Sequence, residues 1–72
     1  MPEAYLLSGR ALLAQKQFRK ATSELTKAVE LDEKLDSGWY WLGVAAEARE
    51  DYQQAQVCYG RAMNLKPENV LT

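Results

Sequence analysis

The chain has 72 residues, 47% of them hydrophobic and 26% charged, which is typical of one small globular domain. Nine Lys and Arg against ten Asp and Glu give a net charge of −1, so the chain sets up no long-range field that attracts nucleic acid or an anionic membrane. It has no histidine, the commonest general base and metal ligand, and its single cysteine, Cys58, excludes an internal disulfide or a thiolate metal cluster.

The sequence shows neither a membrane span nor a secretory signal. No apolar run approaches the roughly 18 residues that a transmembrane helix needs. The first residues, MPEAYLL, lack the basic region and the small-residue cleavage site of a secretory leader. The compartment therefore stays open, with the cytoplasm favoured.

The spacing of apolar and small residues predicts an all-α fold. Four helices are expected, near residues 3–15, 18–31, 37–49 and 52–65. Pro2 suits the first turn of the first helix, and Pro67 ends the fourth because proline cannot continue a helix. Asp36 and Ser37 are candidate N-caps of the third helix, and Asp51 of the fourth. The turns are short, so successive helices should be antiparallel neighbours.

The second half of the chain aligns with the first half at one fixed offset. Small and apolar residues match between the two copies while polar positions drift, as a shared packing scheme would produce. The identical pairs are Gly9 with Gly43, Ala11 with Ala45, Ala14 with Ala48, Ala21 with Ala55, Ala28 with Ala62 and Leu31 with Leu65. An arbitrary four-helix bundle does not predict a fixed period, so the pattern favours tandem helical pairs, a fragment of an α-solenoid.

The two matching glycines lie inside predicted helices, where glycine costs about 1 kcal/mol relative to alanine. Close packing of the paired helices would offset this cost. We expect Gly9 and Gly43 to let Ala21 and Ala55 approach closely. The space beside this contact should be filled by large side chains, namely Tyr5, Phe18, Trp39 and Tyr52.

These residues resemble the tetratricopeptide repeat, a helix–turn–helix unit of about 34 residues. The resemblance implies repeat 1 at residues 2–35, repeat 2 at residues 36–69, and a tail or the start of a third repeat at residues 70–72. It is carried by Tyr5, Gly9, Phe18, Ala21, Ala28, Trp39, Leu42, Gly43, Tyr52, Ala55, Tyr59, Ala62 and Pro67. The chain departs from the family pattern at Glu33, where proline is usual. It also departs at Lys16 and Glu50, where the interhelix turn usually carries glycine and a left-handed conformation would be costly.

Two repeats are fewer than the three or so that such arrays usually need for stability. We therefore expect either that the chain is an excerpt from a longer protein or that its exposed end is covered by another copy. The surface expected to need a partner is the end of the fourth helix, with Tyr59, Ala62 and Met63.

No residue pattern predicts an enzyme, a cofactor site or a metal site. The adjacent carboxylates in the turns are explained by capping and solvation. Ser8 has no histidine partner anywhere in the chain, and Cys58 is interpreted as a half-buried packing residue. A mildly basic strip, interrupted by glutamates, is interpreted as a solvated outer face and comprises Arg19, Lys20, Lys27 and Arg61.

The first helix of each copy carries apolar residues on two sides, and the core needs only one. In SGWYWLG, residues 37–43, neighbouring side chains point about 100° apart, so Trp39 is expected in the core and Tyr40 and Trp41 elsewhere. The resemblance implies that this second side lines a concave face where bound peptides commonly lie. The expected partner-binding residues are Leu6, Leu7, Arg10, Leu13, Tyr40, Trp41 and Val44. The alternative is that they pack against neighbouring repeats or another chain.

The sequence thus predicts a non-catalytic protein–protein interaction module or scaffold without a cofactor. Its ligand is expected to be an apolar or amphipathic peptide segment, with Arg10 pairing an acidic group. Some family members grip a C-terminal carboxylate through Lys and Asn, but the matching positions here hold Leu6, Arg10 and Trp41. The alternatives are homo-oligomerisation through the exposed repeat ends and this groove, and a role as a non-catalytic segment of an enzyme.

Overall fold

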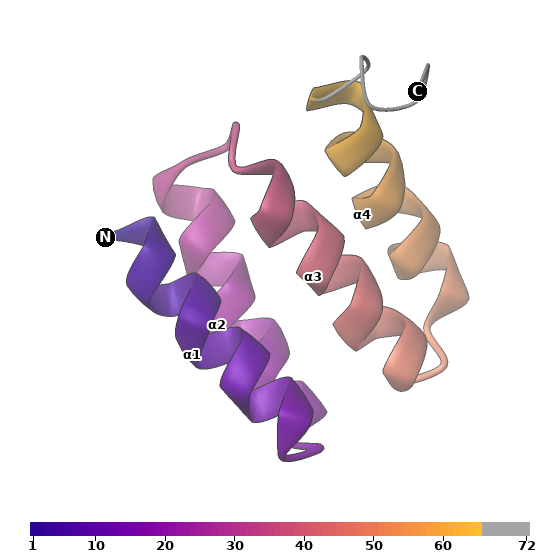
Figure 1. Cartoon of the computed structure of the whole chain (residues 1–72). Coiled ribbons are helices and arrows are strands. Elements are labelled where there is room, and N and C mark those ends of the chain that lie inside the picture. Colours follow the sequence, from indigo (N-terminus) through magenta and orange to yellow (C-terminus); the bar gives the residue numbers. More distant parts are fainter. Residues whose placement is uncertain (66–72) are drawn as a thin grey trace.

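The computed structural model describes residues 1–65 as two helical hairpins that lie side by side (Figure 1). Its elements are α1 (Pro2–Ala14), α2 (Phe18–Leu31), α3 (Asp36–Ala48) and α4 (Tyr52–Leu65). The expected all-α fold is confirmed, and each helix begins and ends close to its predicted bounds. α1 packs on α2, α3 packs on α4, and α2 joins the hairpins by packing on α3. Pro67 and the expected third-repeat start at residues 70–72 lie outside the described residues.

The helix starts follow the predicted signals in α1 and α4 but not in α3. Pro2 lies in the first turn of α1, and the Asp51 carboxylate accepts a hydrogen bond of 3.4 Å from the Gln54 amide at the start of α4. The expected capping by Asp36 and Ser37 is wrong, because α3 begins at Asp36 and both residues lie inside its first turn. The carbonyl of Leu35 accepts the first helical hydrogen bonds instead, from the amides of Gly38 and Trp39 at 3.0 and 3.3 Å.

The α1–α2 turn and the α3–α4 turn each contain a residue in the left-handed conformation. Lys16 has φ 63° and Glu50 has φ 64°. In the first turn, the amide of Gln17 donates to the carbonyl of Leu12 at 2.9 Å and that of Lys16 to Leu13 at 3.0 Å. The second turn repeats this pattern, with Asp51 bonded to Ala46 and Glu50 to Glu47. These paired bonds define a Schellman motif, which satisfies carbonyl groups at the helix end. The motif requires one residue in the left-handed conformation, which glycine adopts most readily, but here Lys16 and Glu50 adopt it.

Small side chains dominate the core. Its buried members are Ala21, Leu25, Ala28, Val29, Leu42, Ala45, Ala46, Ala55 and Cys58. Alanines let the helix backbones approach closely, so the core is thin, and Leu25 and Cys58 are its largest fully buried side chains. Such a core buries little apolar area, as expected for a domain of this size.

Gly9 and Gly43 do make close contacts, and the nearest atoms belong to large side chains of the second helices. A Cβ at Gly9 would lie 2.5 Å from Cγ of Leu25, and a Cβ at Gly43 would lie 2.7 Å from Cε1 of Tyr59. Leu25 and Tyr59 are themselves equivalent positions of the two copies. The glycines therefore make room for Leu25 and Tyr59, and the close approach of Ala21 and Ala55 stays a prediction.

The four large side chains expected beside the glycines differ in burial. Tyr5, Phe18 and Trp39 are half-buried, whereas Tyr52 is 60% exposed, which contradicts its expected packing role. Tyr52 is the first residue of α4, so its side chain lies at the end of the bundle, with no further helix beside it in residues 1–65. The ring of Trp39 reaches back to the α2–α3 connection, where its indole N–H donates a hydrogen bond of 2.9 Å to the carbonyl of Glu33.

Candidate functional site

An open, mainly apolar hollow of about 580 Å³ lies between α1 and α3, and we call it the α1–α3 groove. It is lined by Leu7, Arg10, Ala11, Leu13, Ala14 and Trp41. α1 supplies all of these residues except Trp41, which comes from α3. Four of the seven expected partner-binding residues, Leu7, Arg10, Leu13 and Trp41, are thus brought together here.

Arg10 and Trp41 form the polar edge of the groove. The guanidinium carbon of Arg10 lies 5.1 Å from the centre of the Trp41 ring, within the range of a cation–π interaction. This contact holds the Arg10 side chain across the hydrophobic ring. Arg10 has no ion-pair partner among residues 1–65, so its donors remain open to a ligand.

The groove has a fixed floor and an exposed rim. Leu13 and Trp41 are half-buried and pack against the core, whereas the Leu7 side chain is 61% exposed. The expectation that Trp41 lies wholly apart from the core is therefore corrected. Because Trp41 sits at the junction of two hairpins, one part of its ring covers the core and another part lines the groove.

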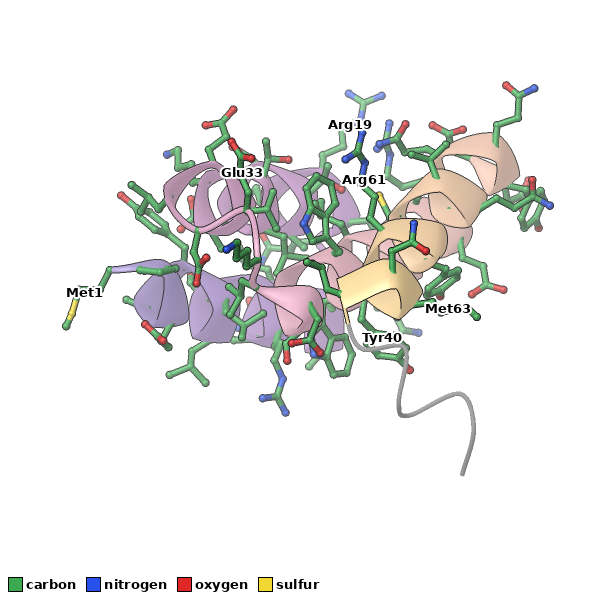
Figure 2. The ribbon with its side chains drawn as sticks, turned by 90° about the horizontal axis from the view of Figure 1, so that it is seen from above. Met1, Arg19, Glu33, Tyr40, Arg61 and Met63 are labelled. Carbon is green, nitrogen blue, oxygen red and sulfur yellow. The ribbon has the colours of Figure 1, made fainter. Side chains whose placement is uncertain are left out.

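The other three expected partner-binding residues do not line the groove. Leu6 packs against the core, Val44 is half-buried, and Tyr40 is turned toward α4. The Tyr40 ring meets Trp41 edge-on at 5.2 Å and Tyr59 at 5.7 Å between ring centres. In Figure 2, Tyr40 lies on the same side of the molecule as Met63, while Arg19, Glu33 and Arg61 lie on the opposite side. Adjacent helical positions diverge by about 100°. Although the two rings touch at their edges, Trp41 therefore lines the α1–α3 groove and Tyr40 lies against Tyr59 of α4.

Tyr59 completes this aromatic row with a hydrogen bond. Its hydroxyl donates to Oε1 of Glu47 at 2.9 Å. Burial, and secondarily the hydrogen bond and negative charge of Glu47, raise the pKa of Tyr59 from 10.0 to about 12. Tyr59 therefore stays protonated at neutral pH and links α4 to α3.

Cys58 is a packing residue with little nucleophilic character. Its side chain is fully buried rather than half-buried as expected, and Sγ accepts a contact of 3.6 Å from Nε2 of Gln54. Burial is the main cause that raises the pKa of the thiol above its ordinary value, which disfavours the reactive thiolate. Across residues 1–65, no three His, Cys, Asp or Glu side chains gather as a metal-binding group. No helix of this part of the chain has the length and apolar character to cross a membrane.

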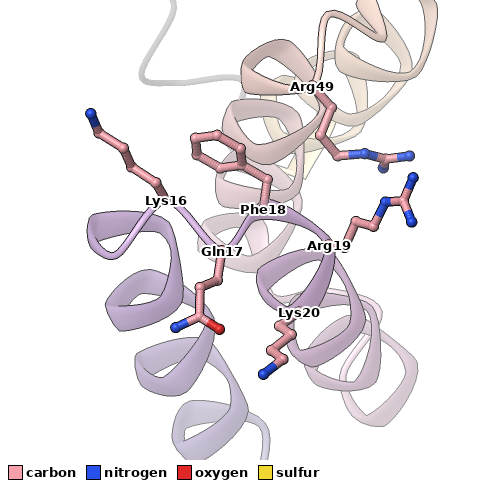
Figure 3. Close-up of a pocket in the computed structure, with 6 residues that line it drawn as sticks. All are labelled: Lys16, Gln17, Phe18, Arg19, Lys20 and Arg49. Carbon is pink, nitrogen blue, oxygen red and sulfur yellow. The ribbon is translucent and has the colours of Figure 1, made fainter.

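A second hollow, of about 620 Å³, was not foreseen from the sequence. It is lined by Lys16, Gln17, Phe18, Arg19, Lys20 and Arg49, and we call it the basic hollow (Figure 3). The sequence indicates Arg19 and Lys20 as part of an outer strip, but Lys16 and Arg49 belong to the turn regions of different hairpins. Only the packing of one hairpin on the next brings them together, and local sequence carries no signal of it.

Comparison with known proteins assigns each half of the chain to the same kind of unit. Family models described as tetratricopeptide repeat match residues 2–35 and residues 37–69. Tetratricopeptide repeat protein 37 of Xenopus laevis is 25% identical over 69 residues, or 96% of this chain and 4% of the relative. Superkiller complex protein 3 of Mus musculus is 30% identical over 66 residues, or 92% of this chain and 4% of the relative. The chain thus spans about 4% of the length of these curated relatives.

Proposed function

The chain belongs to the tetratricopeptide repeat family, and we propose that it binds an apolar or amphipathic peptide segment in the α1–α3 groove. Repeats of this family generally serve as non-catalytic modules for protein–protein interaction. One relative is named as a protein of a complex, which agrees with a role in association with other proteins.

The observation that carries this proposal is the Arg10–Trp41 pair at the edge of an apolar hollow. A large exposed apolar side chain, Leu7, faces solvent beside them. Contiguous apolar surface rimmed by a cation is typical of an interaction site, and Trp and Arg are the residues that most often dominate binding energy. Packing of the core requires neither the exposed Leu7 side chain nor an Arg10 guanidinium without an ion-pair partner among residues 1–65.

The groove also favours a particular ligand. An apolar side chain of the peptide would cover Leu13 and Trp41, and a neighbouring Asp or Glu would pair with the guanidinium of Arg10. The free energy of binding would come mainly from the buried apolar contact, and the ion pair would set orientation and partner choice.

A peptide library displayed on phage and selected against the whole chain tests this function. The selected peptides should share a large apolar residue near an acidic one. Leu7→Ala should weaken their binding by about 1 kcal/mol or more, as expected of an interface anchor, without unfolding the chain. Val57→Ala removes a similarly exposed apolar side chain from α4 and is the matched control. Equal affinities for the two variants would refute the groove as the binding site.

Self-assembly is a second candidate function, favoured by the different burial of equivalent positions in α2 and α4. Val29 of α2 is 4% exposed because α3 covers it, whereas its counterpart Met63 of α4 is 54% exposed in the described residues. Tyr59 and Ala62 extend the same face and are half-buried. A helix of a second copy would cover this face as α3 covers α2.

Light scattering over a concentration series tests this second function. If the α4 face assembles, the mean mass should rise with concentration, and Met63→Glu should abolish the rise because a charge would be buried in the contact. Val57→Glu adds the same charge elsewhere on α4 and should leave the rise unchanged. A strict monomer at high concentration would exclude self-assembly.

A further inference from the structure

The basic hollow collects four cations from three parts of the chain. Lys16 comes from the α1–α2 turn, Arg19 and Lys20 from the first turn of α2, and Arg49 from the end of α3. Figure 3 shows the guanidinium ends of Arg19 and Arg49 turned toward each other, while Lys16 and Lys20 extend outward. The half-buried ring of Phe18 lies between Lys16 and Arg49 in this view.

None of these four charges is neutralised within residues 1–65. They take part in no ion pair or cation–π contact there, whereas Lys27 pairs with Glu24 and Arg61 covers the ring of Trp39. The first turn of α2 also carries no acidic residue, and its N-cap Gln17 makes no capping hydrogen bond. Cations near the positive end of a helix dipole are unfavourable, so the local fold gains nothing from this arrangement.

The second repeat provides an internal comparison. The positions equivalent to Lys16, Gln17, Arg19 and Lys20 are Glu50, Asp51, Gln53 and Gln54. There Asp51 caps the helix in the ordinary way, and none of the four positions is basic. The same backbone therefore forms with acidic and neutral residues, so the cations of the first repeat are not required by the helix–turn–helix fold.

We propose that the basic hollow binds an acidic segment of a partner protein. Arg19 and Arg49 present two planar donor groups to one carboxylate or to two neighbouring ones, a geometry that arginine provides better than lysine. Lys16 and Lys20 flank them and attract further acidic residues. The Phe18 ring offers an apolar contact to the stem of a bound glutamate. This site shares no residue with the α1–α3 groove and stands independently of the function proposed for it.

Fluorescence anisotropy with a labelled, end-capped deca-glutamate peptide tests the proposal on the whole chain. At low ionic strength, about 50 mM salt, the parent chain should bind the peptide, and the double variant Arg19→Gln/Arg49→Gln should bind it at least about tenfold more weakly. These substitutions introduce the glutamines that stand at the equivalent positions Gln53 and Gln15. They should also leave the thermal midpoint unchanged or higher, because they relieve like-charge repulsion.

The matched control is Lys27→Gln/Lys34→Gln, which changes the net charge equally but lies outside the hollow. Its affinity for the peptide should stay within about twofold of the parent, as expected for exposed charges away from the contact. An equal loss in both double variants would overturn the proposal, because binding would then follow net charge alone. Inorganic phosphate that binds as tightly as the peptide would also overturn it, because the hollow would then be a general anion site rather than a surface for an acidic segment.

Discussion

Lys16 and Glu50 occupy equivalent positions of the two repeats and adopt the same left-handed conformation, with φ 63° and 64°. Each follows the first helix of its repeat and closes the same Schellman motif. A side chain in this conformation costs about 1–2 kcal/mol, which the helix-end hydrogen bonds offset in both turns. Because Lys16 and Glu50 carry opposite charges but share this conformation, the helix-end hydrogen bonds of the backbone determine the left-handed φ, and the side chain does not.

Lys16→Gly and Glu50→Gly should therefore stabilise the chain. Glycine removes the left-handed strain but loses more backbone entropy on folding, which leaves a net gain of about 0.5–1 kcal/mol for each turn. Urea unfolding followed by circular dichroism measures the change. Lys34→Gly is the control, since Lys34 lies in a turn without a positive φ and should gain no stability. A loss of stability in both turn variants would contradict the strain argument.

Alanine should have opposite effects at two helical glycines. Gly9→Ala places a Cβ 2.5 Å from the fully buried Leu25 and should destabilise the chain by about 1–3 kcal/mol, as overpacking does. Gly60→Ala meets no atom of residues 1–65 within 4 Å and should stabilise α4 by up to about 1 kcal/mol through helix propensity alone. Thermal unfolding of both variants tests this. A stabilising Gly9→Ala would mean that Leu25 moves aside without cost.

Trp39→Ala should lower the free energy of unfolding by about 2–3 kcal/mol, less than expected of a fully buried tryptophan. The ring is half-buried, anchors the α2–α3 connection through Glu33, and is covered by Arg61 with its guanidinium carbon 5.0 Å from the ring centre. Tyr52→Ala removes an exposed ring and should change the free energy of unfolding by less than about 1 kcal/mol. Chemical denaturation measures both variants. If Trp39→Ala and Tyr52→Ala lost similar free energies of unfolding, the packing of Trp39 would contribute no more to stability than that of an exposed ring.

Alkaline unfolding should report on Tyr59. Its pKa is about 12 in the folded chain against an ordinary 10.0, so folding favours the protonated phenol. The resulting stabilisation is fully present below about pH 10 and is lost as the pH rises toward 12. Tyr59→Phe should flatten this part of the decline in stability, measured by urea unfolding between these two pH values. An unchanged slope in Tyr59→Phe would contradict the assignment.

The regular features of the fold could be predicted because they depend on periodic small and apolar residues. The four helices and the repeat period follow from positions such as Gly9 and Gly43, whose spacing is visible in one dimension. Their nearest neighbours, Leu25 and Tyr59, were not predicted, since a small residue indicates a close approach but not which side chain fills the space. The capping of α3 was also predicted wrongly, because the backbone carbonyl of Leu35 accepts its first helical hydrogen bonds and no capping side chain is involved.

The candidate groove could be predicted only in part. Helical geometry separates Trp39 from Trp41, but it does not show that Trp41 also packs against the core or that Tyr40 turns toward Tyr59. Those contacts depend on how one hairpin lies on the next. The basic hollow depends on the same packing, which is why the sequence does not associate Arg49 with Arg19.

The emission of Trp41 tests the central claim, peptide binding in the α1–α3 groove, most directly. Trp39→Phe leaves Trp41 as the only tryptophan, and Trp41→Phe leaves Trp39. Addition of a selected peptide to the Trp39→Phe chain should shift the emission to shorter wavelength, because the ligand removes water from the half-exposed ring. The Trp41→Phe chain should show no shift. A shift that appears only in the chain retaining Trp39 would place the peptide elsewhere and contradict the proposed function.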